Sequence, residues 1–221
     1  MVFVMPRPAK VHGSSFPYAR KVVPKDVRHV IKRTEWKVPL REPDRASRLR
    51  KHAELVAAWE AEVAAARAQL KGELRALSYR EVLAICGEWY REQLAQDEDE
   101  PGSEEGWDHH RDRLIDLLPS YADEDGEEAH GEFEPDGEWL AEAEELLRKR
   151  GIAAEPASVR RVAVALWDAK FQFASTMMQR ARGDYSTDPN LARFPKRAAP
   201  GAAPPATDAK DAAPGAAKPL L

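Results

Sequence analysis

The chain lacks the sequence patterns from which proteins most often build disulfide frameworks, zinc sites and phosphate loops. It has one cysteine, Cys86, among 221 residues, which excludes an intramolecular disulfide and fits a reducing compartment. No apolar run approaches the roughly 20 residues of a membrane-spanning helix. No Gly-rich phosphate loop, zinc spacing or nucleophile elbow is present. We therefore expect a soluble, cytoplasmic protein that is not an enzyme, with no cofactor, no metal, no membrane contact and no small-molecule substrate.

Charge is sorted by position along the chain. Residues 1–51 contain 14 Lys and Arg against 4 Asp and Glu, a net charge of +10, whereas residues 92–145 contain 2 against 22, a net charge of −20. The whole-chain value of −4 hides both blocks. A basic block is typical of a polyanion binder, and an acidic block cannot share that face with DNA. We expect the basic N-terminal block to contact nucleic acid and the acidic middle block not to contact it.

The hydropathy pattern predicts a mostly α fold with a small β-containing unit of two or three strands over residues 1–43. After the turn signal Gly13-Ser14-Ser15, a strand is predicted whose two faces carry Phe16, Tyr18, Arg20 and Val22 on one side and Ala19, Lys21 and Val23 on the other. Pro24 stops that strand and opens a short helical turn. Alternation resumes over 34–40, with Trp36, Val38 and Leu40 inward and Pro39 marking an edge or a strand end.

Residues 44–77 form the second predicted unit, a long helix with Asp44 as N-cap that runs to about Ala76. Apolar residues recur along it every seven positions: Leu49, Val56, Val63, Leu70 and Leu77. This spacing allows a coiled coil and hence a homo-oligomer. The preferred interpretation is a single amphipathic helix packed on its own domain, because His52, Glu73 and Gly72 weaken the seam.

Residues 78–195 are predicted to form a helical bundle with acidic loops at 97–106 and 121–137. Four helices are predicted here: one after Ser78, one from Trp107 to Leu118, one after Asp136, and one that begins at Pro156 and ends at Gly183. The last of these helices has two apolar stripes, which places it at the centre of the bundle. Residues 196–221 contain 10 Ala, 5 Pro and 2 Gly among 26, which predicts a disordered tail.

The basic block supplies the candidate DNA-binding residues. They are cations interleaved with Phe16, Tyr18 and Trp36, and such cations can neutralise phosphates: Arg20, Lys21, Lys25, Arg28, Lys32, Arg33, Lys37 and Arg41. Arg45, Arg48, Arg50 and Lys51 extend the same patch. The alternative is an ordinary solvated basic surface.

Other reactive side chains are interpreted as structural or solvated. His110 and Arg113 have an H-x-x-R spacing, but neighbouring carboxylates would repel a phosphate, so we treat the match as coincidence. His109, His110 and His130 match no tight metal spacing. Cys86 has no nearby cation at helical spacing and is expected to be a buried thiol.

Residues 16–31, beginning Phe-Pro-Tyr-Ala-Arg-Lys-Val-Val-Pro-Lys-Asp, resemble the N-terminal segment of phage-type tyrosine recombinases (integrases). In that family an aromatic-rich strand ends in Arg-Arg-x-Val-Pro-x-Asp-Leu-Arg and leads to a second strand and a long Ala/Glu-rich helix. Residues 36–60 are similar to that run, and residues 182–195 to a segment that closes the family's helical middle region. Ala19 departs from the pattern, since an aromatic or Arg is commoner there.

The resemblance implies a DNA-binding, non-catalytic N-terminal part of an integrase. The family's catalytic Arg, Lys, H-x-x-R pair and nucleophilic Tyr belong to a further domain, so Tyr185 is not a candidate nucleophile. The alternative function is a protein-interaction module that pairs through the 44–77 helix or through the acidic region. A further hypothesis joins the two charge blocks: the acidic segment folds back and masks the basic one.

Overall fold

The computed structural model describes residues 16–122 and 128–197, and it is mostly helical. The elements in chain order are β1 (Tyr18–Val22), the 3-10 helix η1 (Lys25–Val27), α1 (Arg28–Ile31), β2 (Glu35–Pro39), α2 (Arg45–Lys71), α3 (Tyr79–Asp97), α4 (Glu104–Ile115), β3 (Ser120–Ala122), β4 (Glu128–His130), α5 (Gly137–Lys149), α6 (Pro156–Ala181) and α7 (Asn190–Arg193). The predicted class is confirmed: a small N-terminal β unit, a long helix and a helical bundle. The predicted tail, apart from Lys196 and Arg197, lies outside the described residues.

The N-terminal hairpin packs its inner face on α2. β1 and β2 are antiparallel, and strand alternation turns Ala19 and Val23 to the same side as Trp36 and Leu40. All four are buried in one apolar cluster with residues of α2, and Trp36 stacks on Trp59 with ring centroids 5.7 Å apart. The inward direction predicted for Trp36 and Leu40 is therefore confirmed.

Helix α2 begins as predicted and ends earlier. The Asp44 carboxylate accepts a hydrogen bond from the Ser47 amide at 2.9 Å, which satisfies one of the free N–H groups of the first turn. The helix stops at Lys71 rather than near Ala76, because Gly72 adopts a left-handed conformation with φ 72° and this ends the helical hydrogen bonding.

The middle residues of the seven-residue apolar repeat on α2 pack against the hairpin of the same chain. Val56 and Val63 are buried in the hairpin cluster, whereas Leu49 and Leu70 are 48% and 51% exposed. Leu77 lies beyond the helix and belongs to the core of the bundle. In the structure α2 is therefore a helix packed on its own domain, and the hairpin covers the middle of the predicted coiled-coil seam.

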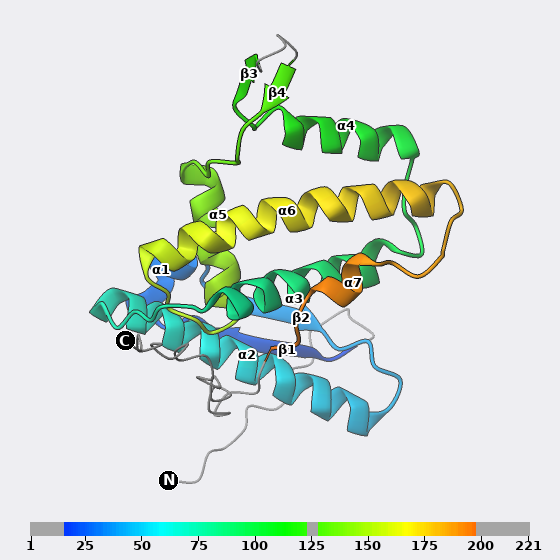
Figure 1. Cartoon of the computed structure of the whole chain (residues 1–221). Helices are drawn as coiled ribbons and strands as arrows, with labels where there is room; N and C mark the ends of the chain where they lie inside the picture. Colours follow the sequence, from blue (N-terminus) through cyan, green and yellow to red (C-terminus); the bar gives the residue numbers. More distant parts are fainter. Residues whose placement is uncertain (1–15, 123–127, 198–221) are drawn as a thin grey trace, which may run out of the picture.

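The remaining helices form a bundle around α6, as predicted. Figure 1 shows α6 between α4 on one side and α3 on the other, with α5 crossing it. Local signals define the helix ends: Ser78 forms a capping box with Glu81, Asp136 caps α5, and Gly183 follows α6 with φ 85°. No helix in the described part of the chain is long and apolar enough to cross a membrane.

After α6 the chain returns along α3 as a strap, residues 184–197. The buried Tyr90 hydroxyl donates to Asp188 Oδ2 at 2.6 Å and lies 2.8 Å from Thr176 Oγ1. Phe194 is buried against Gly87. Since Tyr185 donates its hydroxyl proton to the Glu98 carbonyl, this tyrosine has a structural contact in the strap.

The two charge blocks lie mainly on opposite sides of the molecule. The hairpin and α2 lie at the bottom of Figure 1 and α4 with β3–β4 at the top, separated by α6. Within the region 121–137, predicted as a flexible acidic segment, residues 128–130 form a strand that pairs with residues 120–122. In the described part of the chain, the acidic loops therefore lie mostly away from the basic hairpin, whereas α5 of the acidic stretch shares a groove with α1 and Lys32.

Candidate nucleic-acid interface

The outer face of the β1–β2 hairpin carries two cations side by side. Alternation points Tyr18, Arg20 and Val22 away from α2, and Arg20 lies directly opposite Lys37. Like charges in that position destabilise a strand pair. Arg20 is offset by Glu35, whose Oε2 accepts from Nε at 2.8 Å, while Lys37 Nζ lies 5.1 Å from the centre of the Tyr18 ring. The face is basic and aromatic, with Val22 57% exposed on it.

Further exposed or half-exposed cations cluster at both ends of the hairpin. At the η1–α1 end they are Lys25, Lys32 and Arg33, and at the other end Arg41, Arg45, Arg48 and Lys51. Within residues 16–122 and 128–197, none of these cations has a carboxylate within ion-pair distance. Five strand residues separate the two ends by about 17 Å, which matches about five base pairs of duplex.

The cations at the start of α2 oppose the helix dipole. A helix N-terminus carries partial positive charge and favours acidic side chains, yet the first turn of α2 contains none and includes Arg45. Asp44 precedes the first turn, and its carboxylate is used as the N-cap. The hydrogen bonds from Ser47 lower the pKa of this carboxyl group. Helix stability therefore does not account for these cations, whereas an external anion would.

Two of the eight predicted DNA-binding residues are only half-exposed and are held by partners within the fold, in addition to the exposed Arg20, which pairs with Glu35. Lys21 lies on the inner side of β1 and donates from Nζ to Glu60 Oε1 of α2 at 2.9 Å. Arg28 is half-buried and donates from Nε to the Val23 carbonyl at 2.9 Å. The other six, Arg20, Lys25, Lys32, Arg33, Lys37 and Arg41, are exposed. Together with Arg45, Arg48 and Lys51 they form what we call the basic surface.

A buried histidine, His52, lies on α2 directly after Lys51 and one turn after Arg48. It is 2% exposed, and its Nε2 has no hydrogen-bond partner among the described residues. Burial penalises the charged imidazolium and lowers its pKa from 6.5. The sequence pattern marked His52 only as a weak position in an apolar seam, and the burial follows from the hairpin that covers α2.

Replacing His52 with leucine should flatten the pH dependence of stability. The folded-state pKa lies below the unfolded value of 6.5, so the unfolded chain binds more protons and stability falls as pH drops below about 6.5. One such histidine contributes at most about 1.4 kcal/mol per pH unit. Urea titrations from about pH 7 to pH 5 measure this slope, and a His52→Leu variant with the wild-type slope would contradict the assignment.

The other reactive side chains lie away from the basic surface. His110 Nδ1 and the Arg113 guanidinium are 3.3 Å apart on α4, and burial lowers the His110 pKa. In the described ranges, no three His, Cys, Asp or Glu residues are grouped so that they could hold a metal ion. His109 and His130 are exposed. Cys86 is buried, as predicted, and burial raises its pKa to about 12, which leaves the thiol unreactive.

Within the described residues, six of the eight predicted DNA-binding residues are exposed on the basic surface. It combines the outer hairpin face with cations at both ends, over elements that a single apolar cluster holds together. No family model, curated protein or solved structure matches this chain. Its function is inferred from these residues and their geometry.

Proposed function

We propose that the chain binds duplex DNA through the basic surface, without catalysing a reaction on it. The observation that carries this proposal is the set of cations without carboxylate partners at both ends of the hairpin. Contacts between protein cations and the phosphates of the DNA backbone supply most of the affinity of non-specific DNA binding. Two cations held side by side at Arg20 and Lys37 lose their mutual repulsion when a polyanion lies across them.

The resemblance of residues 16–60 to integrase N-terminal segments supports a role in DNA recombination or integration. In this proposal the chain contributes binding, and strand cleavage belongs to residues of another domain. The alternative of pairing through the 44–77 helix is disfavoured by one observation: Val56 and Val63, at the middle of the predicted seam, are buried under the hairpin.

Removing two cations of the basic surface should weaken DNA binding whatever the DNA sequence. We expect a Lys37→Ala/Arg41→Ala variant to bind a labelled duplex of about 20 base pairs more weakly, with the salt slope reduced by about 0.9 for each phosphate that is no longer neutralised. Fluorescence anisotropy at low and moderate salt measures both quantities.

The matched control removes two exposed cations of the bundle. Arg80 on α3 and Arg160 on α6 form no ion pair within the described ranges, so Arg80→Ala/Arg160→Ala changes the net charge equally. We expect this control to bind like the wild type. Equal weakening in both variants would mean that net charge alone governs binding, and the proposed surface would be wrong.

A further inference from the structure

An open groove of about 640 Å³ separates the basic hairpin unit from α5. One wall is α1, with His29 and Lys32, and the other is α5, with four carboxylates: Glu138, Glu142, Glu144 and Glu145. Arg33 follows Lys32 in the chain; the Glu145 pKa is lowered mainly by the hydrogen bond with Lys149, and the charges of Lys149, Arg148 and Arg33 contribute to it. Cations proposed to contact DNA therefore face a row of carboxylates across the groove.

The cation wall is held in an unusual backbone conformation. Lys32 ends α1 with φ 56°, the left-handed region, and it is the one non-glycine residue with positive φ in the described part of the chain. That conformation disfavours residues with a Cβ and is used here to turn the chain from α1 toward β2. It places an exposed lysine at the rim of the groove.

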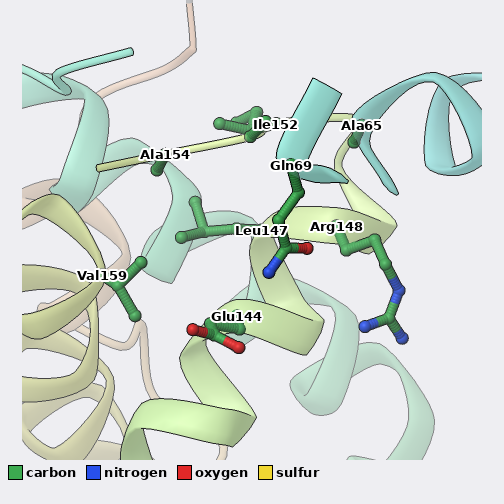
Figure 2. Close-up of a pocket in the computed structure, with 9 residues that line it drawn as sticks. Ala65, Gln69, Glu144, Leu147, Arg148, Ile152, Ala154 and Val159 are labelled. Atoms are coloured by element: carbon green, nitrogen blue, oxygen red, sulfur yellow. The ribbon is translucent and has the colours of Figure 1, made fainter. Parts of the chain in front are cut away.

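The groove is not suited to a buried small ligand. It is open and lined mostly by charged side chains, and three of its lining residues, Gln69, Glu144 and Arg148, also line a cavity of about 30 Å³ (Figure 2). That cavity has room for little more than one water molecule. The groove is therefore better described by its two charged walls than as a pocket.

We propose that the carboxylate row of α5 competes with DNA for Lys32 and Arg33 and so limits the affinity of the basic surface. This inference rests on the proposed function. It retains the masking hypothesis in a narrower form: the acting element is α5, whose carboxylates line the groove with Lys32, and not the acidic loops, of which the first runs from the end of α3 up to α4 (Figure 1). Carboxylates near the docked duplex also repel its phosphates, so both effects lower the affinity.

The test neutralises carboxylates that have no cation of their own. Glu142 and Glu145 pair with Lys170 and Lys149, so their removal would release new cations. Glu138 and Glu144 form no such pair within the described ranges, and Glu138→Gln/Glu144→Gln is the clean variant. We expect it to bind duplex DNA about fivefold more tightly at low salt, with the gain fading above about 0.1 M salt.

Two comparisons make the result specific. Glu105→Gln/Asp116→Asn changes the net charge equally on and just after α4, at the far side of the molecule (Figure 1), and should leave the affinity near the wild-type value. In a Lys32→Ala/Arg33→Ala background, the gain from Glu138→Gln/Glu144→Gln should shrink. Equal tightening in both carboxylate variants, or a full gain without Lys32 and Arg33, overturns the inference while the proposed function stands. If neither the wild type nor any variant binds DNA, both are overturned.

Discussion

Replacing Trp59 with alanine should destabilise the chain by about 3–5 kcal/mol and remove DNA binding. Trp59 is 6% exposed on α2, and its ring stacks on Trp36 of β2 with an interplanar angle of 8°. The hairpin has only two strands, and such a hairpin is marginal without a packing partner. Its outer face is therefore held in place by the apolar contact with α2, which includes this aromatic pair.

Leu49→Ala on the same helix is the control for Trp59→Ala. Leu49 is 48% exposed, so its truncation should change the free energy of unfolding by no more than about 0.5 kcal/mol. Urea unfolding followed by circular dichroism compares the two variants. If Trp59→Ala were as stable as Leu49→Ala, the hairpin would not depend on α2, and the account of the basic surface would lose its structural basis.

Replacing Gly87 with alanine should destabilise the chain by about 2 kcal/mol, although alanine is the better helix former by about 1 kcal/mol. A Cβ at position 87 would lie 2.4 Å from Phe194 Cβ, an atom fixed to the strap backbone. Phe194 also packs against Tyr90, with ring centroids 5.4 Å apart. The strap must therefore move, which disturbs the hydrogen bond from Tyr90 to Asp188.

Gly137→Ala provides the matched control, because a Cβ there meets nothing within 4 Å. We expect Gly137→Ala to be neutral or stabilising, so the two substitutions should have opposite signs. If the amide protons of α3 exchange more slowly in the wild type than in the Gly87→Ala variant, the strap protects that helix. A Gly87→Ala variant that is more stable than the wild type would show that the strap does not press on α3.

Features decided by neighbouring residues were predictable from the sequence. Asp44, Ser78 and Asp136 cap helices at the expected positions, because a capping side chain reaches only the amides of the next turn. Gly151 and Gly183 likewise follow helices with positive φ. The mostly helical class and the central position of α6 follow from apolar periodicity, which records the faces that are buried.

Features decided by distant residues were not predictable. Strand alternation places Lys21 on the face of Ala19 and Val23, but nothing local indicates that its partner is Glu60 on α2. The seven-residue apolar repeat of α2 predicted a buried stripe but did not indicate what covers it, which is the hairpin of the same chain. The β3–β4 pairing joins short segments with little apolar alternation, and its signal is obscured by the surrounding acidic residues.

The salt dependence of duplex binding tests the central claim most directly. If the basic surface neutralises about five phosphates, the number on one strand over its length, a plot of the logarithm of the association constant against the logarithm of salt concentration should be linear with a slope of about −4.5. Affinity should vary little among duplex sequences of equal length. A slope near zero, or no detectable binding at low salt, would contradict the claim that these cations form a DNA-binding surface.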